Sequence, residues 1–191
     1  KDWKKLDLPD DYAVSRPRDP KAPGGAANGF FVGGRARYVR YLRPEKAAHL
    51  ILDVDGAYCN AEVTLNGNQL AEHPHGYTPF LVDLTDTVRF GACNKLEIVT
   101  DDMQPSTRWY SGAGLYRDVF LWTGGDVRVE PWDVFVKTVE ADTHQAVVEI
   151  RYLIASDRTG QAQVRTEIEG TAPVTDTVAV RAGEKTPLTV T

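Results

Sequence analysis

The sequence has little cysteine and no large excess of charge of either sign. Cys59 and Cys93 are the only two cysteines among 191 residues, too few and too isolated to indicate a disulfide framework or a zinc site. We expect both to be buried free thiols, since unpaired cysteine usually fills small spaces in a core. The net charge of −5 gives no electrostatic reason to bind nucleic acid or an anionic membrane.

Long apolar runs are also absent, and none approaches the roughly 20 residues that span a bilayer. The opening residues, Lys1-Asp2-Trp3, do not form the basic and then apolar segment of an export signal, which favours a cytoplasmic location. The chain also begins without Met, as a trimmed sequence would, and an export signal would then be missing as well.

Helical patterns are nearly absent, and short alternating segments closed by turn residues take their place. Leu50, Leu52 and Val54 share one face of such a segment. Asp53 and Asp55 share the other face, which we expect to be solvated. Many short strands of this kind predict an all-β sandwich or barrel.

A predicted hairpin supports the same fold class. Asn66-Gly67 lies between two of the alternating segments and is the dipeptide best suited to a two-residue β-hairpin. Further strands are predicted at residues 80–84, 94–101 and 117–124.

Residues 123–126, Thr-Gly-Gly-Asp, predict a boundary between a domain over 1–124 and a second domain over 125–191. The second domain has about five longer strands rich in Thr, Val and Glu, whereas an immunoglobulin-like sandwich needs about seven. We therefore expect it to be incomplete. Its unpaired edge strands predict association into a homodimer.

No catalytic, metal or cofactor site is predicted from the residues. The acidic pairs Asp10-Asp11 and Asp101-Asp102 are neighbours in sequence, and neighbours in a strand face opposite sides. They are therefore not expected to act together as general acid and base. His73 and His75 lack a third ligand, so a turn between strands is expected there.

The segment around Arg108, Trp109 and Tyr110 leaves two alternatives open. Flat aromatic faces and a guanidinium fork suit the ring face and the hydroxyls of a sugar. The same rings could instead fill a core while the arginine is solvated. Residues 15–34 form the longest segment without a strand pattern, and they are either a mobile surface loop or a loop that contacts a ligand.

Four segments, in the same order, resemble glycoside hydrolase family 2. The last of them, RWYSGAGLYRDVFL, resembles the strand-loop-strand signature of the family's N-terminal sugar-binding domain. It is preceded by WKKLDLPDDY, VGGRARYVRYL and LDVDGAYCNAEVTLNGNQLAEHPHGYTPFLVDLT. The resemblance covers residues 1–123, and the remainder from Asp126 resembles the start of the family's immunoglobulin-like domain.

The resemblance implies a jelly-roll-like β-sandwich followed by a partial immunoglobulin-like β-sandwich. It also implies a partner, a (β/α)8 barrel whose two glutamates act in a retaining mechanism. The signatures of that barrel do not occur in the sequence. The implied function is that of a non-catalytic N-terminal fragment of a β-galactosidase-like enzyme, which meets a β-galactoside substrate only in the full-length protein. The alternatives are a free-standing carbohydrate-binding module and a purely structural domain.

The resemblance also implies which residues lie near substrate. In family members the loop before the Gly-aromatic-Arg-Asp segment reaches over the barrel mouth, often with an Asp where this chain has Arg108. Arg108 and Trp109 are therefore the first candidates for substrate binding, and Asp101 and Asp102 are the second. Part of 15–34 would form another substrate loop. The remaining expectations are an internal Arg117–Asp118 ion pair and a core position for Tyr116 and Trp122.

Overall fold

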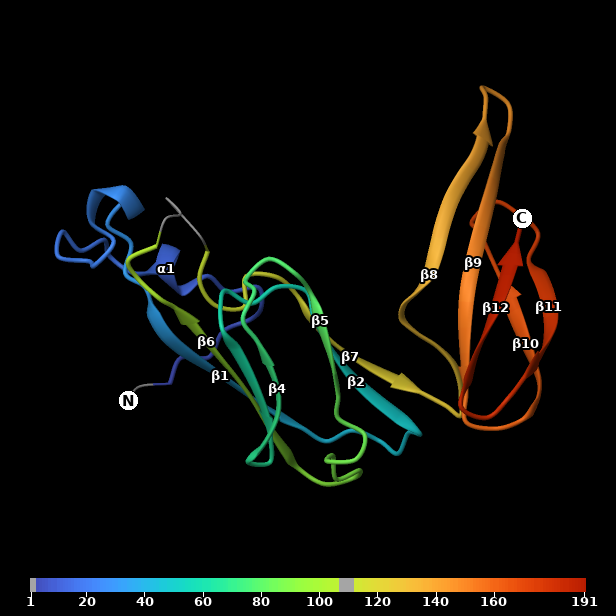
Figure 1. Ribbon diagram of the computed structural model, residues 1–191, viewed down its shortest axis with the longest axis horizontal. Coiled ribbons are helices and arrows are strands. Elements are labelled where there is room, and N and C mark those ends of the chain that lie inside the picture. Colours follow the sequence, from blue (N-terminus) through green and yellow to red (C-terminus); the bar gives the residue numbers. More distant parts are fainter. Residues whose placement is uncertain (1–2, 107–111) are drawn as a thin grey trace. The chain divides into compact units, whose positions relative to one another are not determined.

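The chain is folded almost entirely as β-structure, as the sequence predicts. The computed structural model describes residues 3–106 and 112–191 (Figure 1). They form two compact units, Lys1–Trp122 and Thr123–Thr191, whose division lies two residues before the predicted domain boundary. Helix is confined to α1 (Tyr12–Ser15) and the 3-10 turn η1 (Gly25–Asn28). In the described ranges, no helix is long and apolar enough to cross a membrane.

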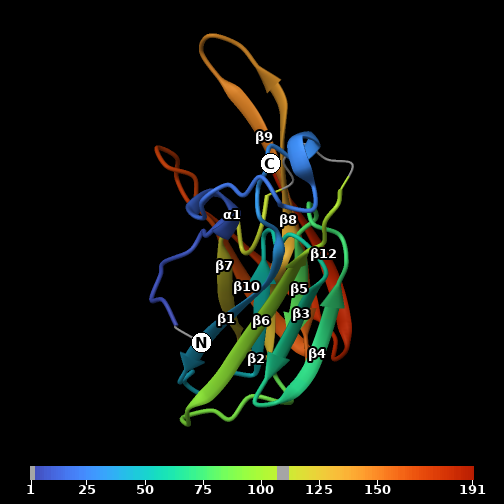
Figure 2. The same cartoon turned by 90° about the vertical axis from the view of Figure 1, so that its left-hand side faces the viewer.

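The first unit is built from two antiparallel sheets. The larger has the strand order β1-β6-β3-β4, and these strands lie side by side in Figure 2. The smaller has the order β5-β2-β7. Their bounds are β1 (Gly34–Leu42), β2 (His49–Val54), β3 (Ala61–Leu65), β4 (Asn68–His73), β5 (Phe80–Asp83), β6 (Asn94–Asp102) and β7 (Val119–Gly124).

The core of this unit lies between the two sheets. It is formed by the side chains at alternate positions along each strand. Leu50, Leu52 and Val54 of β2 are buried on one face, as predicted. They belong to one apolar cluster with Val63 of β3 and Ile98 of β6, which come from the facing sheet. Residues of opposite sheets thus interdigitate through side chains that alternate along each strand.

Two expectations about the outer face of the smaller sheet are wrong. Asp53 is buried instead of solvated, because the indole N–H of Trp122 donates to its Oδ2 at 3.2 Å. Trp122 is 48% exposed instead of lying in the core. The cause is the strand alternation, which packs Val119 against the core and leaves Phe120 and Trp122 outside, with their rings 6.4 Å apart.

The predicted hairpin joins β3 to β4 at Asn66-Gly67. Asn66 has a φ of 54°, a left-handed conformation that asparagine tolerates better than most residues. Its side chain links the turn to the neighbouring strand, since Oδ1 accepts from the Lys95 N–H at 3.0 Å and Nδ2 donates to Asn94 Oδ1 at 2.8 Å. The turn is therefore fixed by side-chain bonds as well as by its backbone preference.

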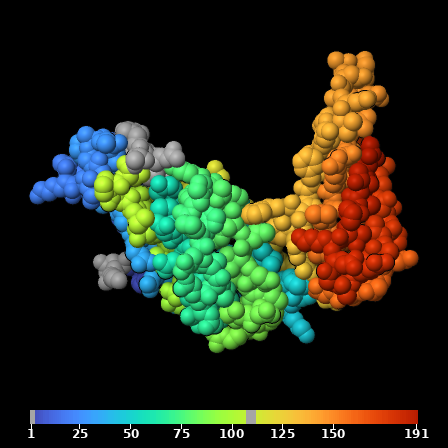
Figure 3. Space-filling view, in the orientation of Figure 1, coloured from blue at the N-terminus to red at the C-terminus, as the bar shows by residue number. Residues whose placement is uncertain are grey.

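The second unit has the five predicted strands in two sheets. The larger has the order β12-β9-β8, and the smaller pairs β10 with β11. Buried Ile150, Ile154, Val180 and Val190 form part of the core. The far end of the β8–β9 hairpin projects beyond the rest of the unit (Figures 1 and 3). The bounds are β8 (Val127–Ala141), β9 (Ala146–Ser156), β10 (Gly160–Thr166), β11 (Val174–Val180) and β12 (Glu184–Val190).

Both cysteines are free, as expected, but neither is fully buried. Cys93 is exposed in the turn that precedes β6, and Cys59 is half-buried. The expectation of two buried thiols is therefore wrong. Both residues lie outside the strands of the first unit, and the core of that unit is filled mainly by aliphatic side chains instead.

Truncation of Asn94 tests this fold, because both polar atoms of its buried side-chain amide have hydrogen-bond partners in the turns around it. Oδ1 accepts from Asn66 and from the Arg89 N–H, both at 2.8 Å, and Nδ2 donates to the carbonyls of Arg89 and Ala92. We expect Asn94→Ala to lower the free energy of unfolding by about 2 to 3 kcal/mol, since buried polar partners would be left unpaired. Denaturant unfolding would measure it.

The matched control is Asn68→Ala, which truncates an exposed asparagine of the same hairpin. We expect that change to stay within about 0.5 kcal/mol of the parent. Equal effects of the two substitutions would contradict the anchoring role of Asn94.

Candidate functional site

The pairing of β1 with β6 decides which loops meet at one end of the first unit. Gly34 lies opposite Asp102 and Arg35 opposite Asp101, and the pairing continues to Leu42 opposite Asn94. The segment that enters β1 and the segment that leaves β6 therefore start from the same end of the sheet. We call this end, with residues 10–34, 56–60, 101–106 and 112–116, the loop end.

Asp101 and Asp102 project to opposite faces of β6, as neighbours in a strand must. Asp102 is 3% exposed and lies beneath the loop that precedes β1. A Cβ added to Gly33 would lie 2.5 Å from the Asp102 carbonyl oxygen and 2.8 Å from its Oδ2, so only glycine fits. Gln104 also donates to Asp102 Oδ2, at 3.4 Å. Asp102 is thus enclosed by the segment before β1, through Gly33, and by the segment after β6, through Gln104.

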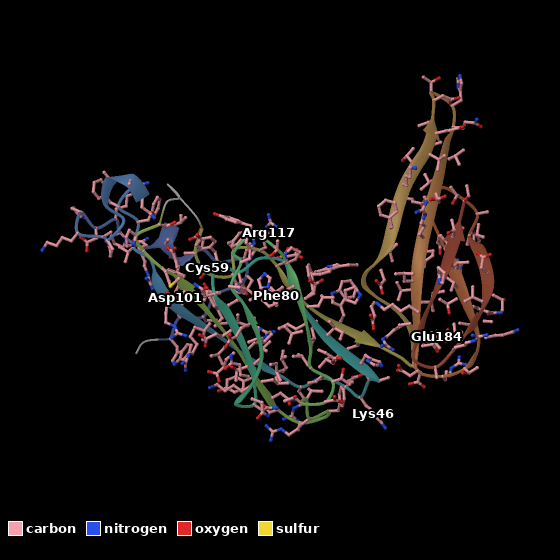
Figure 4. All side chains as sticks on the ribbon, in the orientation of Figure 1. Lys46, Cys59, Phe80, Asp101, Arg117 and Glu184 are labelled. Atoms are coloured by element: carbon pink, nitrogen blue, oxygen red, sulfur yellow. The ribbon has the colours of Figure 1, made fainter. Side chains whose placement is uncertain are left out.

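Asp101 lies on the outer face of the sheet, partly exposed. Its Oδ2 is 3.9 Å from Nε of Arg35, whose guanidinium also bonds Glu62 at 2.8 Å. The Asp101 backbone is held to Cys59 through two bonds, in which its N–H donates to the Cys59 carbonyl and its carbonyl accepts from the thiol (Figure 4). Burial raises the pKa of that thiol, which keeps it protonated as a donor.

Two tyrosines, the buried Tyr12 and the half-buried Tyr38, fasten the opening segment of the chain to the loop end. The Tyr38 hydroxyl donates to Asp10 Oδ2 at 2.7 Å, and the Tyr12 hydroxyl donates to the carbonyl of Gly34. Burial raises the pKa of Tyr38 above its ordinary range, and the Asp10 carboxylate adds to the rise. Burial, with a further contribution from Asp102, does the same for the pKa of Tyr12. Both hydroxyls therefore remain donors.

Among the local sequence signals, only the glycines point to this tyrosine arrangement. Gly114 has a φ of 92°, and a Cβ there would lie 2.2 Å from the Tyr38 hydroxyl oxygen. The adjacent Leu115 carbonyl accepts from the Asp10 N–H at 2.7 Å. Gly114 is therefore required for close approach of the backbone to the opening segment, a packing role that needs no bound phosphate.

The acidic pair Asp10-Asp11 also has separate structural tasks. Asp10 accepts from Tyr38, whereas Asp11 caps α1 by accepting from the Ala13 N–H at 3.0 Å. The two carboxylates therefore do not converge on one point.

The long segment before β1 is folded on itself. The Asp19 N–H donates to the Phe30 carbonyl at 3.0 Å and closes the segment at its base. Two guanidinium groups lie over aromatic rings, Arg16 at 4.5 Å from the Tyr12 centroid and Arg18 at 4.5 Å from that of Phe31. These contacts give the segment a definite course beside Asp102.

Arg108 and Trp109, the first candidates for substrate binding, lie outside the described residues. Their flanks are described: Asp102 ends β6 before them, and Ala113, Gly114 and Leu115 are buried after them. Both ends of this segment are therefore anchored at the loop end.

The expected ion pair between Arg117 and Asp118 does not form among the described residues. The Arg117 guanidinium lies 5.5 Å from the Tyr116 ring centroid instead. Adjacent residues of an extended chain point apart, which explains the difference. Tyr116 is half-buried, and its hydroxyl donates to the Gly76 carbonyl at 2.7 Å.

His73 is the last residue of β4, and His75 lies in the predicted turn between β4 and β5. Both rings bond the hydroxyl of Thr78, at 2.9 Å and 3.2 Å. The His73 ring also stacks on Phe80 at 4.3 Å. Over residues 3–106 and 112–191, no group of three or more His, Cys, Asp or Glu could hold a metal ion.

No family model matches the chain. The curated proteins that it resembles are named as glycosidases. It is 36% identical over 160 residues to Beta-galactosidase BoGH2A of Bacteroides ovatus, covering 82% of this chain and 19% of that protein. It is 32% identical over 100 residues to a beta-glucuronidase of Bacteroides fragilis, covering 49% of this chain and 14% of that protein. The chain thus spans a fifth or less of the curated relatives it matches.

Solved structures agree in fold. A glycosyl hydrolase family 2 member from Bacteroides cellulosilyticus matches with a TM-score of 0.85 and 30% identity, over 98% of this chain and 26% of that one. The resemblance predicted from sequence is confirmed by these matches, which cover both units. The chain therefore belongs to glycoside hydrolase family 2.

Proposed function

We propose that the chain is the non-catalytic N-terminal part of a β-galactosidase-like retaining glycosidase. In this role it supports a catalytic barrel and lends a loop to the substrate pocket. The observation that carries the proposal is the pairing of Gly34 with Asp102, which brings the segment before β1 and the segment after β6 to one end of the sandwich. Relatives named as a β-galactosidase and a β-glucuronidase support the substrate class.

The engaged carboxylates favour a supporting role over a catalytic one. Retaining hydrolysis needs two carboxyl groups about 5 to 5.5 Å apart that face one glycosidic bond. At the loop end Asp10 accepts from Tyr38, Asp101 faces Arg35, and Asp102 is enclosed beneath Gly33. Each of these carboxylates fixes the backbone or a neighbouring strand.

Substrate contact is assigned to the segment between the two anchors. Arg108 could donate to sugar hydroxyls or a carboxylate, and Trp109 could stack on a sugar ring. Asp101, which is partly exposed, is the second candidate. Asp102 would act by holding the base of the loop, since it is buried there.

The proposal predicts that the chain has no glycosidase activity of its own. Mixed with a chromogenic β-galactoside, it should release chromophore at the rate of the blank, since general acid/base catalysis alone contributes about 10²- to 10⁴-fold. The full-length protein should turn the same substrate over. Sustained turnover by the purified chain would contradict the non-catalytic role.

The loop assignment predicts the effect of substitutions in the full-length protein. Arg108→Ala and Trp109→Ala should each lower kcat/KM about 10- to 100-fold, the range expected when a charged hydrogen bond or a stacking contact to substrate is lost. Arg37→Ala is the matched control, because Arg37 pairs with Glu97 on the outer face of β1. If kcat/KM is unchanged in all three variants, the domain is purely structural.

Sugar binding by the chain alone separates the proposal from a free-standing carbohydrate-binding module. Calorimetric titration with galactose or lactose should show no saturation below about 1 mM, because one loop cannot offset the cost of ordering and desolvating a sugar. Saturable binding well below that concentration would favour the module.

A further inference from the structure

Four aromatic side chains lie together on the surface of the first unit. The rings of Tyr58 and Tyr77 have centroids 5.3 Å apart, and the His75 ring lies 5.9 Å from that of Tyr77. The hydroxyl of Tyr116 donates to the carbonyl of Gly76, the residue between His75 and Tyr77, at 2.7 Å. We call Tyr58, His75, Tyr77 and Tyr116 the aromatic patch.

Backbone hydrogen bonds join the aromatic patch to the loop end. Tyr58 and Gly114 form an isolated antiparallel bridge, in which the Tyr58 N–H donates to the Gly114 carbonyl at 2.9 Å and the Gly114 N–H donates back at 3.0 Å. The neighbouring residues Ala57 and Leu115 belong to the core. The tyrosine that follows each of them is therefore directed away from the core. The patch thus adjoins the segment to which the proposed function assigns substrate contact.

Two rings of the patch are held in place by close packing on glycine. A Cβ on Gly76 would overlap the Tyr58 ring, and a Cβ on Gly56 would lie 2.8 Å from Cζ of Tyr116. Both rings therefore lie directly against glycine backbone, where a larger residue would displace them. Side chains that are already fixed lose little conformational freedom when a ligand binds, so they suit a binding surface.

The patch presents aromatic rings and hydrogen-bond donors to solvent. Tyr77 is 38% exposed, and His75 is exposed as well. Arg117, labelled in Figure 4, is also exposed, and its guanidinium lies 5.5 Å from the ring centroid of Tyr116. A flat ring with a polar edge suits the C–H face of a pyranose, and a guanidinium suits its hydroxyls.

We propose that the aromatic patch, together with Arg117, binds a further sugar unit of an oligosaccharide whose terminal β-galactoside is held in the substrate pocket. A few rings on an open surface bind one sugar weakly. The contact becomes effective when the terminal sugar is already held, because the second contact is then intramolecular. The inference therefore rests on the proposed function, which supplies the pocket for the terminal sugar.

The size of the patch favours a sugar over a protein as its ligand. A stable protein interface buries about 800 Å² on each partner. One aromatic side chain contributes about 150 to 250 Å² when fully buried, and the rings of Tyr58 and Tyr116 are already half covered. The exposed part of the patch is thus too small for a protein interface, whereas a pyranose needs only one or two rings.

Two substrates of the full-length protein test the inference. Nitrophenyl β-galactoside carries no second sugar, and galactosyllactose is a trisaccharide with a terminal β-galactoside. Tyr77→Ala should lower kcat/KM for galactosyllactose about 3- to 10-fold relative to kcat/KM for the nitrophenyl galactoside, because the ring contact serves only the longer substrate. Tyr77→Phe keeps the ring and should restore most of this ratio.

The matched control is Tyr41→Ala, which truncates an exposed tyrosine near the other end of β1. It should leave the ratio of the two kcat/KM values at that of the parent. Equal ratios in Tyr77→Ala and Tyr41→Ala would overturn the proposal.

Chemical modification tests the patch without a substitution. Tetranitromethane nitrates exposed tyrosines, and saturating galactosyllactose should slow the nitration of Tyr77 in the full-length protein several-fold. Tyr41, which is 65% exposed, should react at the same rate with and without the sugar. If the sugar does not slow the nitration of Tyr77, the proposal is wrong.

The remaining outcomes separate this inference from the proposed function and from a protein ligand. If the full-length protein hydrolyses the nitrophenyl galactoside but not galactosyllactose, the proposed function stands and the inference is wrong. If it hydrolyses neither substrate but galactosyllactose protects Tyr77, the proposed function fails and the sugar contact stands. If Tyr77 resists nitration without any sugar while Tyr41 reacts, another protein surface covers the patch and the inference is wrong.

Discussion

The antiparallel pairing of β1 with β6 is the constraint on which the first unit depends. It runs without a register shift from Gly34 and Asp102 at one end to Leu42 and Asn94 at the other. At the first end it brings together the segment before β1 and the segment after β6. At the second end Asn94 ties the Asn66-Gly67 hairpin to the turn that precedes β6. A single-residue slip would turn Asp102 outward and Asp101 into the core, which would disrupt both ends.

The strands could be predicted from the sequence because their side chains alternate. Leu50, Leu52 and Val54 are buried together as expected, and the Asn66-Gly67 turn lies where the dipeptide predicts it. Alternation also gave the correct outcome for Asp101 and Asp102, which face opposite sides. The predicted burial of Trp122 and exposure of Asp53 are wrong because both predictions relied on residue type alone. The tryptophan lies on the outer face and covers the Asp53 carboxylate there.

The loop end could be predicted only in part, because it is held by contacts between residues far apart in the sequence. The bonds from Tyr38 to Asp10 and from Tyr12 to Gly34 span 28 and 22 residues. Neither has a local pattern that a periodicity argument could detect. The close packing at Gly33 and Gly114 likewise follows from the approach of a distant strand, so the glycines indicate that something comes near without identifying it.

The two anchors that flank residues 103–113 have a consequence for how such a protein can diversify. On one side Asp102 is enclosed beneath Gly33, and on the other the Leu115 carbonyl accepts from the Asp10 N–H. Of the described residues between them, Gln104 adds one bond of 3.4 Å to Asp102, whereas the anchor at Leu115 is formed by backbone atoms alone. Replacements at exposed positions between them, such as Met103 and Pro105, therefore leave both anchors in place, so this part of the surface can vary while the sandwich keeps its stability.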